Sequence, residues 1–384
     1  MSPWAAEFAA ARSQTDELFS LLDPAALYER PVADRHRLIF YLGHLEAFDW
    51  NLLSRYALDR PAFEPSFDQL FAFGIDPEPG GASADQPSDW PSEPAVRSYA
   101  ERVRREVDEQ LAELPEQLLH VALEHRWMHA ETLAYLFHNL PYEVKTGPAP
   151  VASDRPGIVN SMIEIPVGTA VLGRPRGDGF GWDNEFDRHV VEVPAFRISK
   201  FKISNGEYLE HVRQGATAPN FWVERQGRWF LRGMFGEIPL PLDWPVYVTH
   251  SEATAFAKAR GGTLPTEAQF HRAATGSTSV NTNFERWDPV AADLGASGVH
   301  GTVQMLGNGW EWTSTAFGPF PGFEKFPFYP GYSADFFDGK HFVLKGGSPR
   351  TARCFFRSSF RNWFRPDYSY LYAGFRITSE PEKP

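Results

Sequence analysis

The chain of 384 residues contains a single cysteine, Cys354, so no intrachain disulfide can form and a reducing compartment is expected. No apolar run approaches the roughly 20 residues that a membrane-spanning helix needs. The first residues lack the basic segment and the apolar core of a secretory signal peptide. These absences predict a cytoplasmic protein that has no membrane partner.

Basic residues are scarce relative to acidic ones. The chain carries 37 Lys and Arg against 49 Asp and Glu, a formal net charge of −12. Because a surface of this sign repels a phosphate backbone, we expect no nucleic-acid partner. Hydrophobic residues at 42% and charged residues at 22% are typical of a globular protein with a sizeable core. The length favours two domains, and we expect a monomer that acts on small molecules.

What the sequence does contain is a pair of histidines at helical spacing. His125 and His129 stand in a run where leucine and alanine recur with helical periodicity up to Pro141. Residues four apart project from one face of a helix, so the two imidazoles could bind one metal ion. Such a pair is more often a coincidence than a site, and two ligands do not complete one. His44 offers a third ligand, although a core histidine bonded to a backbone carbonyl is the alternative interpretation.

Residues 1–145 are predicted to form an antiparallel four-helix bundle, in which metal ligands commonly face one another across the core. Helices are expected at 3–22, 34–53, 95–113 and 115–140. Asp34 is the candidate N-cap of the second helix. Residues 76–94 are rich in Pro, Gly, Ser and Asp and are predicted to form a loop.

The composition changes at residues 146–159, a Pro- and Gly-rich segment that we interpret as a linker. Residues 160–384 are then expected to form a second, mostly irregular domain held by aromatic packing, which makes the fold class α+β. Short alternating segments predict strands within it, for example at 189–198 and 342–348, and helices are predicted only at 250–259 and 265–274. Thr266 is the candidate cap of the second of these helices.

Several segments of the second domain resemble the formylglycine-generating-enzyme (sulfatase-modifying-factor) fold, a C-type-lectin-like arrangement. They are GlyTrpAspAsnGluPhe (181–186), residues 248–270, LeuGlyAsnGlyTrpGluTrpThr (306–313), LeuLysGlyGlySer (344–348) and PheArgAsnTrpPhe (360–364). The first domain resembles the DinB-like bundle. With His44 in LeuGlyHis and the HisxxxHisxGlu pattern at 125–131, the pairing is similar to the nonheme iron sulfoxide synthases of thiohistidine biosynthesis, the EgtB and OvoA types, and to the related SenA-type selenoneine synthase.

The resemblance implies one Fe(II) ion held by His44, His125 and His129. It also implies an O2-dependent enzyme that forms a C–S or C–Se bond at the imidazole C2 of hercynine, the trimethylated histidine. Three neutral imidazoles leave about three octahedral positions open for the substrates and O2. Carboxylates that accept a hydrogen bond from the other ring nitrogen are expected to orient the imidazoles, and the candidates are Glu46, Asp49, Glu124 and Glu131.

Substrate and proton-transfer residues follow from the same resemblance. Asn362 and Trp363 match an Asn-Trp pair that helps to hold hercynine, and we expect them near the metal. An aromatic face suits a quaternary ammonium group, at about 0.5–2 kcal/mol each. The predicted substrate-binding residues are Met128, Phe320, Asn362, Trp363, Phe364 and Tyr368. Because Phe320 stands where the family has a tyrosine, the predicted catalytic proton relays are Tyr41, Tyr329 and Tyr332.

The predicted sulfur or selenium donor rests on a departure from the family pattern. Relatives that use γ-glutamylcysteine carry an Asp directly after Asn-Trp and an Arg four residues later, where this chain has Phe364 and Tyr368. A donor with additional carboxylates would lose its charge-paired partners here. We therefore expect a donor other than γ-glutamylcysteine, namely cysteine or a selenosugar.

Other functions stay open at this point. Within the class they are a selenoneine synthase and an OvoA-like histidine/cysteine sulfoxide synthase. Outside it they are a zinc-dependent DinB-like thiol transferase and an inactive ligand-binding protein. A pure transferase would not require the second domain, whereas the resemblance implies a substrate pocket at the domain interface. Formylglycine generation is disfavoured because that resemblance implies a copper-binding cysteine pair, and the chain has only Cys354.

Overall fold

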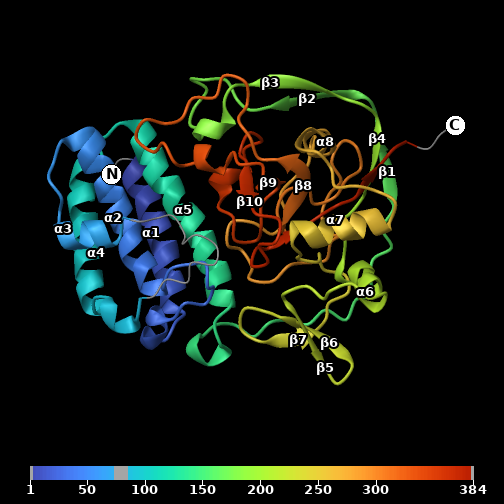
Figure 1. The fold of residues 1–384 in the computed structure, drawn as a ribbon, viewed down its shortest axis with the longest axis horizontal. Helices are drawn as coiled ribbons and strands as arrows, with labels where there is room; N and C mark the ends of the chain where they lie inside the picture. The colour runs from blue at the N-terminus through green and yellow to red at the C-terminus, as the bar shows by residue number, and fades with distance from the viewer. Residues whose placement is uncertain (1–2, 73–84, 382–384) are drawn as a thin grey trace. The chain divides into compact units, whose positions relative to one another are not determined.

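The structure, a computed structural model, describes residues 3–72 and 85–381. It divides into two compact units, Met1–Pro148 and Ala149–Pro384, which we call the helical unit and the mixed unit (Figure 1). A helical domain followed by a mixed α/β domain confirms the predicted fold class. Residues 76–84 of the predicted loop lie outside the described residues. Within the described ranges, every helix is too short or too polar to cross a bilayer.

Four long helices build the helical unit: α1 (Pro3–Ser20), α2 (Leu38–Leu53), α4 (Glu93–Gln110) and α5 (Glu116–His138). Shorter elements connect them: α3 (Pro65–Leu70), a π-helical turn (Ser54–Leu58) and 3-10 turns at Pro24–Tyr28, Pro87–Asp89 and Tyr142–Val144. Helix α2 packs against α4 and α5, and α1 packs against α5. Every residue of α2 except Phe48 and Asn51 is buried. The polar side chains of α2 therefore need partners inside the protein.

The predicted start of α2 is wrong. The helix begins after Arg37, the N-cap residue, and Asp34 does not cap it. Asp34 instead lies in a turn, in which the N–H of Arg35 donates to the carbonyl of Val32 at 3.0 Å. The Arg37 guanidinium donates to the Asp85 carboxylate at 2.8 Å, a contact that fixes the chain at the true start of the helix.

Up to residue 381, the last one described, the mixed unit contains four small sheets, with strand orders β10-β9-β8-β11, β1-β4-β12, β5-β6-β7 and β2-β3. The strands are β1 (Met162–Ile165), β2 (Gly168–Leu172), β3 (His189–Val193), β4 (Phe196–Ser199), β5 (Trp222–Arg225), β6 (Arg228–Arg232), β7 (Glu237–Pro239), β8 (Trp310–Ala316), β9 (Phe342–Lys345), β10 (Asn362–Phe364), β11 (Ala373–Gly374) and β12 (Thr378–Ser379). The paired strands are antiparallel except β8 and β11, which run parallel. Many of these strands join segments that lie far apart in the chain, so the unit depends on long-range contacts.

Two strand predictions need correction. The strand predicted at 189–198 is divided into β3 and β4 at Pro194, because proline has no N–H to donate to a ladder. Strand β9 ends before the predicted residue 348, because Gly346 and Gly347 have φ values of 97° and 88°. These values leave the extended region and favour glycine.

The described part of the mixed unit also has three α-helices: α6 (Asn205–Arg213), α7 (His250–Ala259) and α8 (Glu267–Ala273). Helices α7 and α8 confirm the two predicted ones, and the Thr266 side chain caps α8 as expected. The prediction of only two helices is wrong because α6 was missed. Ser204 and Glu207 form a reciprocal capping box at its start, a signal that was present in the sequence.

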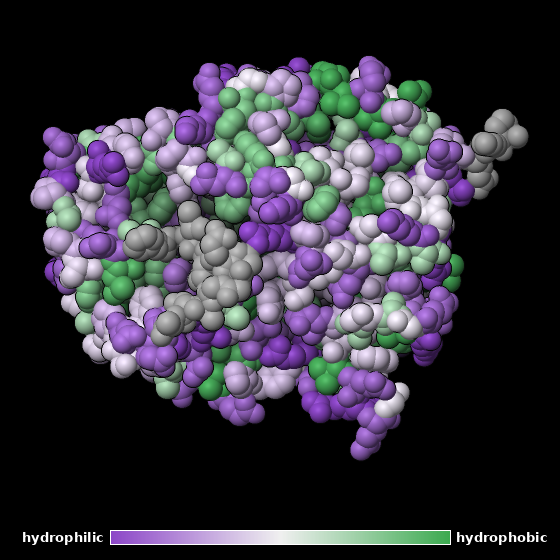
Figure 2. Space-filling model, viewed as in Figure 1, coloured by the Kyte–Doolittle hydropathy of each residue, from purple (hydrophilic) through white to green (hydrophobic). Residues whose placement is uncertain are grey.

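The β2–β3 hairpin carries apolar side chains on its outer face. Val171 and Val190 are a cross-strand pair, and both are exposed. Hydrophobic side chains gather over this hairpin at the top of the view in Figure 2, among otherwise mixed surface residues. Apolar atoms make up much of the surface of any folded protein, and we assign no role to this pair.

Candidate metal centre

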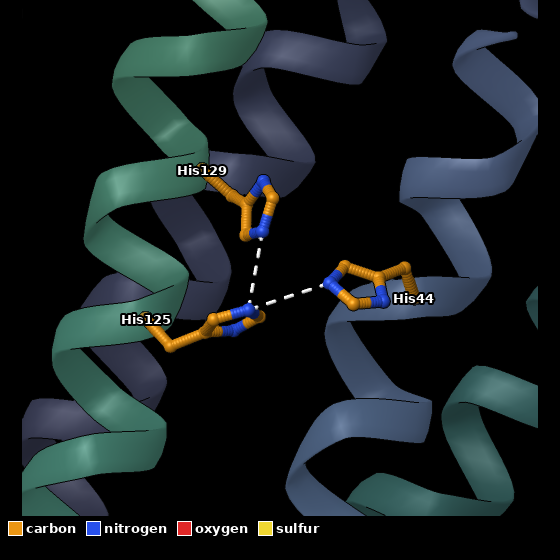
Figure 3. A group of neighbouring side chains, drawn as sticks. All are labelled: His44, His125 and His129. Carbon is orange, nitrogen blue, oxygen red and sulfur yellow. Dashed lines mark hydrogen bonds between the residues drawn. The ribbon is translucent and has the colours of Figure 1, made fainter. Parts of the chain in front are cut away.

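Three histidines of the helical unit converge on one point. His44 comes from α2, and His125 and His129 come from successive turns of α5 (Figure 3). The Nε2 atom of His125 lies 3.3 Å from that of His44 and 3.1 Å from that of His129. The candidate ligand atoms of the three residues all lie within 4.8 Å of one another. The three side chains that the sequence singled out are therefore brought together, with the same ring nitrogen directed inward.

The aromatic residues of α2 hold two of the rings. The His44 ring stacks on Phe40, one turn earlier, with centroids 4.8 Å apart. The His125 ring stacks on Phe48, with centroids 3.5 Å apart and an interplanar angle of 11°. Because Phe40 and Phe48 stand four residues before and after His44, one helix both supplies a candidate ligand and orients another.

The second nitrogen of His44 fixes its tautomer. Nδ1 lies 2.7 Å from the backbone carbonyl oxygen of Phe71, the C-cap residue that follows α3. A carbonyl only accepts, so Nδ1 carries the proton and Nε2 keeps its lone pair. This arrangement is the usual one for a metal-binding histidine, whose other nitrogen donates to a carbonyl or carboxylate.

Burial keeps the imidazoles neutral. It lowers the pKa of His44 to about 4, although the hydrogen bond to Phe71 acts in the opposite direction. Burial also lowers the pKa of His125 and of His129 well below the usual value, and the positive charge of Arg126 adds to the effect at all three. A neutral imidazole is the form that binds a metal ion.

The donor set fits a metal ion. With metal–nitrogen distances near 2.1 Å, two imidazoles at right angles on an octahedral ion are separated by about 3 Å. The two closest Nε2 separations, 3.1 and 3.3 Å, match that spacing. Three neutral nitrogen ligands suit Fe(II) and Zn(II) alike. The geometry is therefore consistent with a metal centre for which His44, His125 and His129 are the candidate ligands, and it does not by itself distinguish iron from zinc.

Two of the predicted carboxylate partners of the histidines have a different role. Glu46 and Asp49 accept hydrogen bonds from the buried Arg126 guanidinium, at 2.6 and 3.0 Å. Glu46 also accepts from Arg104 at 2.8 Å, which connects α2 to α4. Burial alone would raise the pKa of Glu46, but the guanidinium groups of Arg126, Arg104 and Arg12 outweigh it and lower the value to about 2. These carboxylates therefore join α2, α4 and α5, and the partner of His44 is a backbone carbonyl instead.

Two other predicted site residues lie beside the triad. Tyr41 is buried on α2, and its ring centroid is 5.7 Å from that of His129. Met128 precedes His129 on α5 and is half-buried. Their predicted roles in proton transfer and substrate binding stay predictions.

The predicted acceptor residues lie on strand β10 of the mixed unit. Trp363 stacks on Phe317 with centroids 4.1 Å apart and an interplanar angle of 6°. Tyr332 meets the Trp363 ring edge-on at 5.3 Å. Asn362 accepts a hydrogen bond from the N–H of Trp363 at 2.9 Å, which folds its side chain onto its own strand. One face of the indole is thus covered by Phe317, and the proximity of this pair to the metal stays a prediction.

The remaining predicted residues also belong to the mixed unit. Phe320 is buried beneath the Arg361 guanidinium, which lies 4.0 Å from the ring centroid. Phe364 and Tyr368 stack on each other with centroids 5.0 Å apart. Tyr329 and Tyr332 pack together at 5.5 Å. The structure pairs these residues as aromatic contacts, and their substrate and catalytic roles stay predictions.

The site also contains residues that the sequence analysis missed as functional. They are Phe40, Phe48, Phe71 and Arg126. Spacing could have identified the first two, because both lie four residues from His44. Arg126 follows His125 directly but carried no distinguishing signal, and the role of Phe71 depends on its backbone, which no side-chain pattern reveals.

Comparison with known proteins agrees with this architecture. Residues 7–138 match the family model of the DinB superfamily, and residues 148–294 and 279–381 match the Sulfatase-modifying factor enzyme 1-like domain. Among solved structures, PvdO from Pseudomonas aeruginosa aligns with a TM-score of 0.43 at 18% identity, over 57% of this chain and 94% of that one. This likeness is too low to support an argument.

Curated relatives share both domains. The "Hercynine oxygenase" of Mycolicibacterium smegmatis is 31% identical over 97% of this chain and 97% of its own length. "Ergothioneine biosynthesis protein 1" of Schizosaccharomyces pombe is 29% identical over 93% of this chain but only 53% of its own length. The chain thus spans about half the length of the fungal relatives that it matches. On the domain matches and on the identity along the whole mycobacterial relative, the chain belongs to the hercynine oxygenase and ergothioneine biosynthesis protein family, which joins a DinB domain to a sulfatase-modifying-factor-like domain.

Proposed function

We propose that the chain is an Fe(II)- and O2-dependent oxidoreductase that joins sulfur or selenium to the imidazole C2 carbon of hercynine. The observation that carries the proposal is the convergence of three neutral Nε2 atoms from α2 and α5, in a chain that belongs to this family. Iron held by His44, His125 and His129 would supply open coordination positions for O2 and for the sulfur or selenium of the donor substrate.

The residues of the chain itself would keep the site ready for that ion. The Phe71 carbonyl holds the proton on Nδ1 of His44, so Nε2 is available without a deprotonation step. Tyr41 is our candidate for the residue that holds a proton near His129, in place of the family tyrosine that is Phe320 here. A Tyr41→Phe variant should keep its metal and lose turnover, and unchanged turnover would remove this role.

We propose that Asn362 and Trp363 bind the acceptor. The stack on Phe317 fixes the indole plane, and a fixed aromatic face can meet a trimethylammonium group without first losing side-chain freedom. Trp363→Ala should weaken hercynine binding in calorimetry by roughly 2- to 30-fold, the equivalent of about 0.5–2 kcal/mol. Metal content should not change. Unaltered hercynine binding would contradict the assignment.

We further propose that the donor is not γ-glutamylcysteine. Phe364 and Tyr368 stack on each other, so this pair offers ring surface and one hydroxyl where a charged donor would need an ion pair. Cysteine and a selenosugar-borne selenol are the donors that this pair fits. A selenoneine synthase is accordingly the second candidate within the class, and an enzyme that uses histidine and cysteine is the third.

The test is a side-by-side assay of the metal-loaded chain with hercynine, O2 and each of three donors. Mass spectrometry would follow the C2-substituted product, and His44→Ala would be the inactive control. We expect clear turnover with cysteine or the selenosugar and weak turnover with γ-glutamylcysteine. A preference of tenfold or more for γ-glutamylcysteine, about 1.4 kcal/mol in transition-state terms, would refute the donor proposal.

A double replacement sharpens the donor test. Phe364→Asp with Tyr368→Arg would restore the charged pair that the chain lacks, and it should raise turnover with γ-glutamylcysteine relative to cysteine. Phe364→Leu with Tyr368→Leu is the matched control that removes the stack without adding charge.

A zinc-dependent thiol transferase is the alternative from another class. The same three imidazoles would serve it, since zinc binds such a set readily. Metal analysis with oxygen consumption separates the two: iron with O2 uptake supports the synthase, and activity with zinc under anaerobic conditions supports the transferase.

A further inference from the structure

Gly43, in the middle of α2, has no evident reason to be a glycine as far as helix formation is concerned. A glycine inside a helix is about 1 kcal/mol less favourable than alanine. Its φ is not in the left-handed region, so the backbone does not require it either. The explanation has to come from the space around it.

That space is filled by the ring of Phe71. A Cβ atom on Gly43 would lie 2.5 Å from Cδ2 and Cε2 of Phe71 and 2.6 Å from its Cγ, far inside van der Waals contact. Phe71 is fully buried, and its ring meets those of Phe67 at 5.6 Å and Tyr99 at 6.2 Å. The ring is therefore enclosed by α2 on one side and by aromatic neighbours on the other, and it has little room to yield.

The same residue presents its carbonyl to the metal centre. The Phe71 oxygen accepts from Nδ1 of His44 at 2.7 Å, and His44 follows Gly43 directly. The ring of Phe71 thus lies against Gly43, and its carbonyl accepts a hydrogen bond from His44, the next residue of α2. The close approach of the ring to the bare Gly43 backbone and the hydrogen bond of the carbonyl to the imidazole therefore occur together at one residue.

We infer that Gly43 is a positioning residue of the metal centre: its missing Cβ seats Phe71 so that the Phe71 carbonyl holds His44 in the tautomer that directs a lone pair at the metal. The inference rests on the metal centre of the proposed function and adds a residue to it. Neither Gly43 nor the Phe71 side chain touches the metal, so both act through His44.

Metal titration of the full chain tests the inference. The metal-free protein would be titrated with Co(II), whose absorption spectrum reports coordination, and with Zn(II) in competition with a chelator. Gly43→Ala should raise the dissociation constant about 10- to 100-fold, the usual effect of losing a partner of a metal-binding histidine. Helix propensity alone has the opposite sign, because alanine should stabilise α2. A dissociation constant within twofold of the unaltered chain would overturn the inference.

A double-mutant cycle tests whether the ring is the cause. Phe71→Ala removes the ring and leaves the carbonyl, so adding Gly43→Ala to it should change the dissociation constant less than about threefold. If Gly43→Ala raised the dissociation constant by the same factor in the unaltered chain and in Phe71→Ala, the inference would be overturned. If Gly43→Ala prevents folding, recovery of the fold in the double variant supports the inference, and failure in both backgrounds overturns it.

Two further readouts separate this inference from the proposed function. His44→Ala should abolish metal binding; if it does while Gly43→Ala has no effect, only the present inference fails. If His44→Ala binds metal as the unaltered chain does, the assignment of His44 to the metal centre, and with it the proposed function, is wrong. Nitrogen-15 NMR of ring-labelled histidine should show that Nδ1 of His44 carries the proton. In Gly43→Ala, His44 should no longer be protonated at Nδ1 alone.

Discussion

Replacing Arg126 by methionine should destabilise the helical unit more than any surface change of the same size. The guanidinium is fully buried between Glu46 and Asp49, whose side chains are 1% and 0% exposed. Removing one member of a buried ion pair usually lowers the free energy of unfolding by about 3–5 kcal/mol, because a charge is left without a partner. Glu46 would keep Arg104 at 2.8 Å, so Asp49 is the carboxylate that would suffer most.

The loss should depend on pH. Burial already raises the pKa of Asp49 to about 6, even though Arg126 opposes the shift, so removal of Arg126 should raise it further. An acid whose pKa is higher in the folded than in the unfolded state, where it is near 3.9, destabilises the fold increasingly as pH rises between the two values. The free energy of unfolding that Arg126→Met loses should therefore be smaller at pH 5 than at pH 8. The difference should be about 1.4 kcal/mol for each unit by which the substitution raises the pKa of Asp49.

Urea unfolding followed by circular dichroism at 222 nm is the appropriate assay, since the four long helices belong to the helical unit. Adding Asp49→Asn to Arg126→Met should recover part of the loss, because it removes the unpaired charge. Arg105→Met, at an exposed position of α4, is the matched control and should change stability by less than about 0.5 kcal/mol. A loss in the free energy of unfolding below about 1 kcal/mol, or an equal loss at pH 5 and pH 8, would refute the reasoning.

Two further predictions concern the metal centre and the mixed unit. Free metal at 100 times its dissociation constant should raise the free energy of unfolding of the helical unit by about 2.7 kcal/mol in the same assay, and His44→Ala should show no such rise. Glu311→Gln should lower the free energy of unfolding of the mixed unit by about 3–5 kcal/mol, which calorimetry would show as a lower transition temperature. The reason is that Glu311 contacts the fully buried Lys202 at 2.6 Å and Arg376 at 3.0 Å. An unchanged transition would contradict that assignment.

The helical unit was largely predictable because its signal is periodic. Apolar residues recur along each long helix, so the existence of all four was evident from the sequence. Helix starts depend instead on local turns, which explains the wrong cap at Asp34. Helix α6 was missed because it has only nine residues and carries Gly206 in its first turn, which weakens the periodic pattern although Ser204 and Glu207 mark its start.

The candidate site was predictable only as far as side-chain spacing reaches. The pair at His125 and His129 follows from one helix, and His44 was identified with it through the resemblance. The alternative interpretation of His44, a buried histidine bonded to a carbonyl, is confirmed for Nδ1, which makes that bond. Nε2 faces the other imidazoles, and its role as a metal ligand stays a prediction. Which carboxylates would serve the histidines could not be predicted, because the sequence does not show that Arg126 binds Glu46 and Asp49.

The placement of His44 and His125 on different helices has a consequence for how the helical unit opens. These residues are 81 positions apart in the chain, so an ion bound by both is a removable cross-link around a long loop. Closing a loop of that length in the unfolded chain would amount to about 4–5 kcal/mol on the chain-entropy model. Helices α2 and α5 could not separate until the ion had dissociated, so proteolysis of the loaded helical unit would be limited by metal release. A chelator should then expose α4, which lies between α2 and α5 in the chain, to protease while the mixed unit stays resistant.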